Sequence, residues 1–192
     1  MSKLFYGIGC NSKREHKAKT NNKHTPAYRT WRSMLQRCYC HKYHKNKPSY
    51  ISCEVDDSFQ DFQDFADWFY GHPYSEMGYQ LDKDLLTTNN KIYSPDTCCF
   101  VPIELNVILT DHEAARGKYP QGVTFNKRSG KYVASISING NQKGLGYFYT
   151  VEDAYKAYKT AKEDYVKVKA LDWQDRIADD VFTALMKWKL NS

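Results

Sequence analysis

The chain has 192 residues, which suits one compact domain or two small ones and excludes a large multidomain enzyme. Its mean hydropathy is -0.74, and it contains no apolar run of roughly 20 residues, so no membrane-spanning helix is expected. A short apolar secretory segment near Met1 is also missing, and we therefore expect a cytoplasmic protein. Hydrophobic residues make up 41% of the chain and aromatic residues 15%, which is enough for a core.

The net charge of +6 combines three stretches of different sign. Residues 1–50 contain 12 Lys and Arg and one acidic residue, residues 51–118 contain 4 and 13, and residues 119–192 contain 12 and 8. The basic beginning and the mildly basic end suit phosphate contacts, and the acidic centre suits carboxylates that hold a metal. Nucleic acid is therefore the first partner to consider. The alternative is that these charges form an ordinary solvated surface.

Six cysteines raise the question of a zinc site. Cys38, Cys40 and Cys53 lie near two histidines in the sequence, but the chain has no C-x2-C pair, and C-x-C is a poor half of a tetrahedral site. Structural zinc is therefore not expected. Disulfides are not expected either without a secretory signal, so we interpret most of the cysteines as reduced and partly buried.

Residues 1–24 have no sustained hydrophobic period and are rich in Lys, Asn and Gly, so we interpret them as a basic arm. From Pro26 onward apolar residues fall at helical spacing, and Thr25 is suited to cap this helix. Arg29 and Arg32 lie on other faces of the helix, where they could contact phosphates or belong to an ordinary surface. The expected core positions are Tyr28, Trp31, Met34, Leu35 and Cys38.

A second helix is predicted from Ser58 to Phe69, with Asp57 or Ser58 as its cap. Opposite its apolar stripe, aspartates repeat every three residues at Asp61, Asp64 and Asp67. We interpret these aspartates as a solvated helix face rather than a metal site. Residues 79–106 then predict a strand, an Asn-rich turn, a second strand and a helix that begins at Pro102. This order makes a compact ββα unit.

The last third predicts a three-stranded antiparallel sheet, because three β-prone runs are separated by turn signals at 128–130 and 139–141. Thr150 is suited to cap the helix that follows, and a last helix is predicted from about Asp172. Alternation along the central strand assigns one face to that helix and exposes the other. The helix-facing set is Tyr132, Ala134, Ile136 and Ile138, and the exposed set is Val133, Ser135, Ser137 and Asn139. The predicted fold class is α+β.

Residues 79–106 resemble the ββα-metal finger of phage-type HNH homing endonucleases. The resemblance is carried by Leu81–Asp84, Asn89–Asn90, Tyr93–Asp96, Cys98–Pro102 and Asn106. The two upstream helices, with Trp31–Tyr39 and Phe59–Trp68, are similar to the leader region of many such proteins. The resemblance implies helices followed by an HNH-like finger, and it implies metal-dependent cleavage of DNA.

In that family a His acts as general base, and the metal is bound by an Asp and by an Asn or His on the helix. Asp82 and Asn106 match the metal-binding positions, so the resemblance implies Mg²⁺ or Mn²⁺ there. Lys83 stands where the catalytic His is expected. An exposed Lys with a pKa of about 10.4 is protonated and cannot take a proton from water. It could instead contact a phosphate or stabilise an oxyanion, which leaves His112, His72 or a metal-bound hydroxide to activate water.

Residues 119–168 resemble the sheet and helix of the Apetala/ethylene-response-factor class of DNA-binding domain. The resemblance is carried by Gly122–Val123, Gly130–Ala134, Leu145–Phe148 and Thr150–Tyr158. In that class the exposed sheet face lies in the DNA major groove, and its side chains are rich in Arg and Trp. The shorter polar residues here predict weaker sequence specificity. The resemblance implies that the DNA-facing residues are Thr124, Asn126, Arg128, Lys131, Ser135, Ser137, Gln142 and Lys143.

The predicted organisation is a basic arm (1–24), a helical leader with an HNH-like ββα element (25–116) and a sheet-and-helix DNA-binding domain (117–192). The predicted function is binding of double-stranded DNA by a homing-endonuclease-like protein, in the host cytoplasm if it is phage-encoded, with Mg²⁺- or Mn²⁺-dependent cleavage left open. One alternative is a catalytically inactive DNA-binding regulator or inhibitor of a host function. Another is a protein-binding module that uses the acidic centre, so a protein partner stays open.

Overall fold

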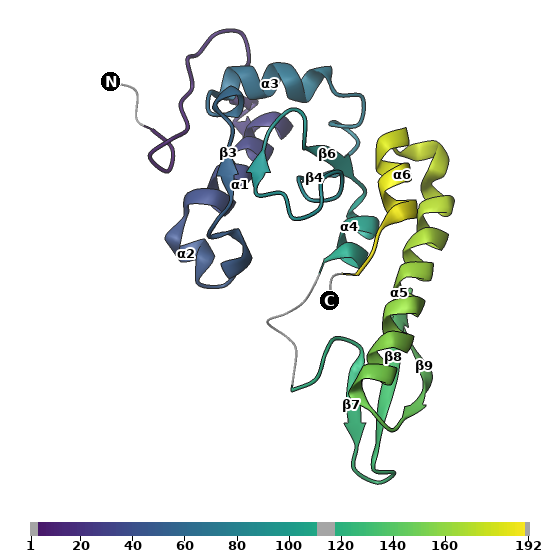
Figure 1. Cartoon of the computed structure of the whole chain (residues 1–192). Helices are drawn as coiled ribbons and strands as arrows, with labels where there is room; N and C mark the ends of the chain where they lie inside the picture. The colour runs from purple at the N-terminus through teal and green to yellow at the C-terminus, as the bar shows by residue number, and fades with distance from the viewer. Residues whose placement is uncertain (1–3, 111–117, 191–192) are drawn as a thin grey trace. The chain divides into compact units, whose positions relative to one another are not determined.

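The computed structural model describes residues 4–110 and 118–190. The chain divides into two compact units, Met1–Ile103 and Glu104–Ser192, and each is described by itself (Figure 1). The predicted α+β class is confirmed, since the described residues form six α-helices and several small, mostly antiparallel sheets. The division falls before the predicted boundary at residue 116, because α4 (Ile103–Leu109) contributes to the second unit. There Glu104 accepts a hydrogen bond from Lys169 at 2.6 Å.

Helix α1 (Pro26–Tyr39) begins as predicted, with the Thr25 hydroxyl accepting from the Tyr28 amide at 3.4 Å and Pro26 in the first turn. A single turn, α2 (His41–His44), and a 3-10 turn at Pro48–Tyr50 follow. The predicted apolar positions of α1 are buried, and Trp31 is fully so. Its indole donates to the Phe59 carbonyl at 2.8 Å, which satisfies the one polar atom of a ring in the core.

Helix α3 (Phe62–Gly71) begins later than predicted. Asp57–Phe59 form a separate 3-10 turn, because the Asp56 carboxylate accepts from the Ser58 amide at 3.0 Å and starts that turn by itself. Asp61 then caps α3 by accepting from the Gln63 amide at 3.0 Å. The apolar stripe of α3 packs against α1 as an aromatic core, with Phe62, Phe65, Ala66 and Phe69 all buried.

Short strands complete the first unit. β1 (Lys19–Thr20) and β2 (Lys23–His24) form a hairpin before α1. β3 (Glu54–Val55) pairs in parallel with β5 (Ile92–Tyr93), and β4 (Gln80–Asp82) pairs antiparallel with β6 (Cys99–Val101). Residues 83–91 connect β4 to β5. Both strands are paired, β4 with β6 and β5 with β3, so this loop is fixed at both ends.

The described part of the basic arm packs along α3 rather than extending into solvent. The Phe62 amide donates to the Cys10 carbonyl at 2.9 Å, and the His16 amide donates to the buried Gln63 side chain at 2.8 Å. Arg14 pairs with Asp64, and His16 contacts Asp67 at 2.7 Å. The aspartate face was predicted to be solvated, and this prediction is wrong in part. The face binds the arm because both charge signs meet there.

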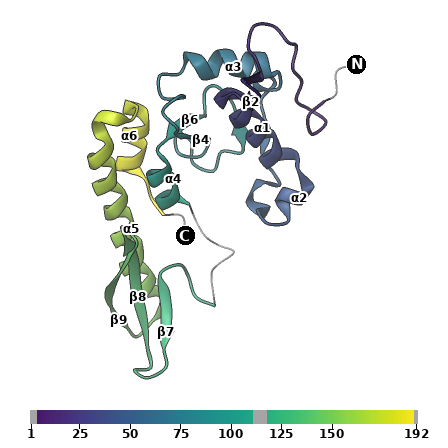
Figure 2. The same ribbon diagram turned by 180° about the vertical axis from the view of Figure 1, so that it is seen from behind.

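In the second unit, β7 (Val123–Asn126), β8 (Lys131–Ile138) and β9 (Asn141–Phe148) form an antiparallel sheet in that order. Helix α5 (Val151–Trp173) crosses one face of this sheet (Figures 1 and 2). Thr150 caps α5 as predicted, accepting from the Asp153 amide at 3.1 Å. The last helix, α6 (Asp179–Lys187), begins after the predicted position near Asp172, because α5 continues through Trp173 and a 3-10 turn at Gln174–Arg176 follows.

The core of this unit lies between the sheet and α5, where Ala134, Ile136, Ala154 and Tyr158 are buried. Gly122 has a φ of +77°, and a Cβ at this position would lie 2.0 Å from the Tyr158 ring, so only glycine allows this close approach. No helix in the described ranges combines the length and the hydrophobicity that crossing a membrane requires.

Candidate nucleic-acid interface

The β7–β8–β9 sheet has one covered face and one open face. On β8 the side chains of Ala134 and Ile136 are 0% and 3% exposed and pack on the α5 side, whereas Ser137 is exposed. The predicted alternation is therefore confirmed. Residues paired across neighbouring strands share a face, so the register extends the open face from β8 to both edge strands.

The open face gathers most of the predicted DNA-facing residues. Val133 lies opposite Thr124 on β7 and Tyr147 on β9, and Ser137 lies opposite Gln142. At the end of β7, Asn126 lies opposite Lys131, and Ser135 continues the same row along β8. Thr124, Ser137 and Gln142 are exposed, so they can reach a ligand without rearrangement of the sheet.

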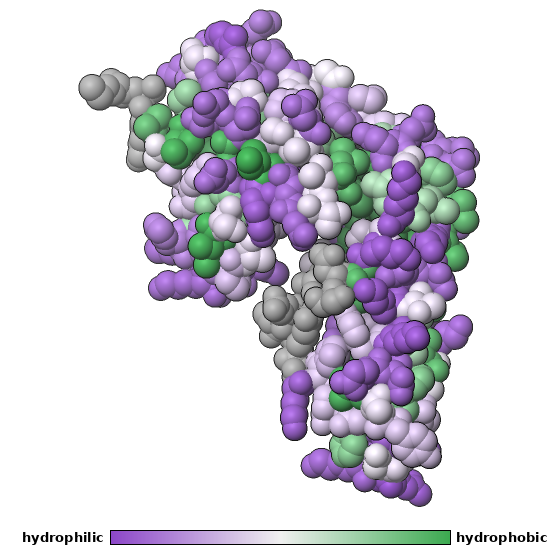
Figure 3. Space-filling view, in the orientation of Figure 1, coloured by the Kyte–Doolittle hydropathy of each residue, from purple (hydrophilic) through white to green (hydrophobic). Residues whose placement is uncertain are grey.

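The β7–β8 turn presents Arg128 to solvent. The Asn126 side-chain oxygen accepts from the amides of Arg128 and Ser129, at 3.0 and 3.1 Å, and Gly130 takes a φ of +66°. Asn126 thus holds the turn with its own side chain, which limits its predicted contact with DNA to the remaining amide donors. Figure 3 shows hydrophilic side chains gathered at this turn, at the lower end of the view.

Lys143 lies on a different side of the sheet from its predicted position. Its register partner is Ile136, a residue of the covered face, whereas its neighbour Gln142 pairs with Ser137 on the open face. Consecutive strand residues point to opposite faces, so the two side chains cannot share one. Lys143 is exposed on the edge strand β9 on the α5 side.

Two tyrosines that the sequence prediction missed belong to the open face. Tyr147 is 61% exposed and lies opposite Val133, and Tyr149 is 79% exposed with the Lys131 ammonium 4.5 Å from its ring centroid. Counting by twos from Gln142 places Phe148, not Tyr147, on this face. The register shift between Ala134 and Ser135, a β-bulge, reverses that count. The sequence signal that was missed is a pair of tyrosines two residues apart at the end of a predicted strand.

The sheet carries positive charge that acidic residues of the same stretch do not balance. Residues 118–151 contain five Lys and Arg and no Asp or Glu. The second unit's described acidic residues therefore lie on its helices and in the turn between α5 and α6. An open face with no carboxylate next to its cations attracts an anion rather than forming internal ion pairs.

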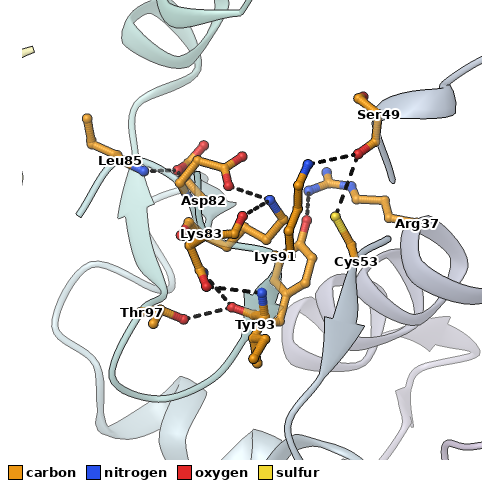
Figure 4. Close-up of polar contacts among 12 residues, drawn as sticks. Arg37, Ser49, Cys53, Asp82, Lys83, Leu85, Lys91, Tyr93 and Thr97 are labelled. Carbon is orange, nitrogen blue, oxygen red and sulfur yellow. Dashed lines mark hydrogen bonds and ion pairs between the residues drawn. The ribbon is translucent and has the colours of Figure 1, made fainter. Parts of the chain in front are cut away.

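Lys83, at the predicted catalytic position, is buried. Its side chain is 4% exposed, and its ammonium donates to the Asn90 carbonyl at 2.9 Å and pairs with Asp84 (Figure 4). The Tyr93 ring lies below it, with 5.7 Å from nitrogen to centroid. Burial alone would lower the pKa of Lys83, but the hydrogen bond and charge of Asp84 outweigh burial and raise it. The expected exposure is wrong, and the raised pKa does not support a role as general base.

The donor set around Asp82 does not fit Mg²⁺ or Mn²⁺. One carboxylate oxygen of Asp82 accepts from the amides of Asp84 and Leu85, both at 2.8 Å, which closes the turn after β4. Burial raises the pKa of Asp82 against these hydrogen bonds, whereas both ions prefer ionised carboxylates with free lone pairs. Asp84 is paired with Lys83. Within residues 4–110 and 118–190 no three His, Cys, Asp or Glu side chains gather as metal ligands.

The other residues predicted to take part in cleavage do not lie together with Asp82 in one described unit, with the exception of His72. Asn106 is on α4, in the second unit, whereas Asp82 belongs to the first. His112 lies outside the described residues. His72 ends α3, where its ring packs 4.8 Å from the Phe100 ring, centroid to centroid, and its Nδ1 accepts from the Tyr74 amide at 3.3 Å. His72 therefore stabilises the turn after α3.

Arg29 and Arg32 lie on α1, one helical turn apart, on the side that faces the β1–β2 hairpin. Arg29 is exposed, and Arg32 is half-buried with its guanidinium 5.8 Å from the Phe5 ring centroid.

Comparisons of the chain with protein-family models, with curated proteins and with solved structures find no match. The geometry of the two units therefore carries the functional argument.

Proposed function

We propose that the chain binds double-stranded DNA through the open face of the β7–β8–β9 sheet. The observation that carries this proposal is the exposed face itself, which joins polar side chains, two tyrosines and cations in a stretch without acidic residues. The major groove admits β-strands, and DNA-binding proteins place ribbons and sheets in it. The resemblance of residues 119–168 to the Apetala/ethylene-response-factor class supports the same orientation.

We assign two roles to the residues of the interface: some position the protein on the DNA backbone, and others read base edges. Arg128, exposed at the turn, and Lys131, in the same row of β8 as Ser135, bind backbone phosphates. Ser137 and Gln142 are short uncharged groups that accept and donate at base edges. Tyr147 adds an exposed ring for contact with sugars or thymine methyl groups. The base-edge contacts come from short uncharged side chains, so we expect weak sequence preference.

We propose that residues 80–109 retain the strand, strand, helix order of an HNH-like ββα element without its hydrolytic centre. β4 pairs with β6, α4 follows β6 along the chain, and β5 lies in the connection between the two paired strands. The Lys83 ammonium and the amide-bound Asp82 support binding without cleavage. This corresponds to the regulator or inhibitor alternative.

The DNA proposal is tested by measuring duplex binding across a salt series for the full chain. Arg128→Ala and Lys131→Ala should each weaken binding at every sequence and lower the salt slope by about one. Lys156→Ala removes the same charge from an exposed position of α5, away from the open face, and should change the slope little. Absence of duplex binding at low salt, or equal effects of all three substitutions, would refute the sheet as the interface.

The absence of cleavage is tested on supercoiled plasmid with Mg²⁺ or Mn²⁺. We expect no nicking that depends on Asp82 or Asn106. Asp82→Asn is the suitable variant, because the amide oxygen still accepts from the turn amides and preserves the fold. Nicking by the wild-type chain that disappears in both Asp82→Asn and Asn106→Ala would contradict binding without cleavage.

A further inference from the structure

A small cationic pocket lies on α1 in the first unit, apart from the sheet. Its volume is about 170 Å³, and it is open to solvent. Four of its residues come from one face of α1 at spacings of three and four. The lining residues are Tyr6, His24, Arg29, Arg32, Ser33 and Gln36.

Arg32 lines this pocket and carries a buried donor that has no acceptor among the described residues. Its guanidinium packs against Phe5 and Tyr28, 5.8 and 5.9 Å from their ring centroids, which holds the planar group in place. Its Nε is buried and has no hydrogen-bond partner among the residues that the structure describes. A buried donor without an acceptor is costly, and an oxyanion entering the pocket would remove this cost. The guanidinium fork matches the oxygens of a phosphate better than any neutral ligand.

The surroundings of the pocket are positively charged. Residues 16–53 contain nine Lys and Arg and no Asp or Glu. Arg29 makes no ion pair within the described ranges. The pKa of His24 responds to this positive charge. Desolvation and then the charges of Lys19, Arg32 and Arg29 lower it. The pocket therefore concentrates positive potential that no side chain of its own neutralises.

We propose that this pocket binds one phosphate group, and that the group belongs to the backbone of DNA. The phosphate chemistry follows from Arg29 and Arg32, with the Ser33 hydroxyl and the Gln36 amide as further donors. The assignment to DNA rests on the proposed function and on the exposed Lys19 and Lys23 of the β1–β2 hairpin, which extend the cationic surface beyond one phosphate. Free inorganic phosphate offers the same oxygens and is the competing occupant.

The pocket is tested first without DNA, by titrating the full chain with inorganic phosphate against chloride at matched ionic strength. We expect the Arg32 Nε–H signal to shift in the NMR spectrum and the His24 pKa to rise, because an anion opposes the cations Lys19, Arg29 and Arg32 beside it. The Tyr28 ring is the other titratable side chain packed against His24, with 5.0 Å between the two ring centroids. Unchanged Arg32 and His24 signals would overturn the pocket as a phosphate site.

Duplex binding then identifies the source of the phosphate. Arg32→Lys keeps the charge but removes the guanidinium fork, and it should weaken binding roughly tenfold. Arg32→Gln should also lower the salt slope by about one, whereas Lys42→Gln removes an exposed charge outside the pocket and should have little effect. Arg32 variants that bind phosphate poorly but duplex normally would refute the assignment to DNA. Failure of the wild-type chain to bind duplex would refute the sheet proposal, and the phosphate titration would still decide the pocket.

Discussion

Lys83 holds the loop between β4 and β5 together. Its ammonium reaches the Asn90 carbonyl, and the Asn90 side chain returns a hydrogen bond to the Lys83 carbonyl at 2.8 Å. Asn90 also donates to the Ile92 carbonyl at 2.6 Å, so the loop is closed at the start of β5. The residue at the position expected for a catalytic His therefore acts as a cross-link of the loop.

Truncation of Lys83 should destabilise the first unit. Lys83→Ala leaves the partly buried Asn90 carbonyl without a donor and opens a cavity beside Tyr93, so we expect a loss of about 3 kcal/mol in the free energy of unfolding. Lys83→Met fills the space but not the hydrogen bond and should lose about 1–2 kcal/mol. Urea denaturation measures both. Equal stability of the two variants and the wild type would show that the loop does not need the cross-link.

The same side chain makes stability depend on alkaline pH. The pKa of Lys83 is raised in the folded chain from its ordinary value of 10.5, so its contribution is complete below pH 10.5. That contribution is lost as the pH rises through the folded-state pKa. The difference in unfolding free energy between wild type and Lys83→Met should therefore narrow above pH 10.5. Taking the difference between the two proteins removes the contribution that other lysines and tyrosines make to the pH dependence. A difference in unfolding free energy that stays constant above pH 10.5 would contradict a charged Lys83 in the folded chain.

The cysteines should differ in reactivity. Burial raises the pKa of both Cys38 and Cys98 to about 12, so few thiolates form at these positions near neutral pH. Cys40 is partly exposed. Alkylation of the native chain followed by mass spectrometry should label Cys40 well before Cys38 or Cys98. Labelling of all positions at one rate would indicate that the native core opens faster than the reagent reacts.

At the scale of elements, the arm and α3 form a clasp that depends on Asp61. This carboxylate accepts from the Ser12 amide at 3.2 Å and from the Gln63 amide at 3.0 Å, and it thereby joins arm and helix. Burial would raise its pKa, but the Ser12 and Gln63 hydrogen bonds outweigh burial and lower it. The clasp is therefore intact above the ordinary value of 3.8 and weakens as the pH falls through the lowered pKa.

Loss of this clasp should expose the arm to protease. Asp61→Ala removes the helix cap and the Ser12 contact, at about 1–2 kcal/mol together, and frees Lys13 and Lys17 as tryptic sites. We expect faster cleavage at these lysines in a limited digest. Glu76→Gln, an exposed acid with no contact to the arm among the described residues, is the matched control. An unchanged digest of Asp61→Ala would show that Arg14 and Gln63 hold the arm without it.

Elements with a local signal could be predicted, and those defined by distant contacts could not. Asn139 and Gly140 take φ values of 49° and 81°, which these two residue types tolerate, so the β8–β9 turn is visible in the sequence. The clasp between the arm and α3 joins Arg14 to Asp64, 50 positions away, and hydrophobic periodicity in the sequence does not indicate such a distant contact. The bulge lies opposite Ala134 and Ser135, where Leu145 of β9 is the extra residue between Gly144 and Gly146. Gly146 takes a φ of +138°, so glycine inside the strand was the sequence signal for the bulge that puts Tyr147 on the open face. Thr124, Ser137 and Gln142 were found because alternation is local.

At the scale of the whole molecule, both proposed interfaces occupy stretches from which acidic residues are missing, 16–53 and 118–151. Each stretch belongs to one unit. Arg32 and Lys131 belong to different units, so we expect the free-energy effects of Arg32→Gln and Lys131→Gln on duplex binding to add. The summed net charge of +6 conceals this arrangement, because acids elsewhere in the chain balance most of the cations.

The charge of the second unit is distributed unevenly, because the sheet has no acidic residues. Residues 152–190 carry eight acidic residues and eight Lys and Arg, so the helices are neutral in sum while residues 118–151 hold a charge of +5. A polyanion therefore exerts a torque on the unit and turns the sheet toward itself before contact. Lys131→Glu should slow association several-fold at low salt in stopped-flow measurements, and the rates should converge as salt screens the field. A rate deficit that persists at high salt would mean that the sheet acts only after encounter.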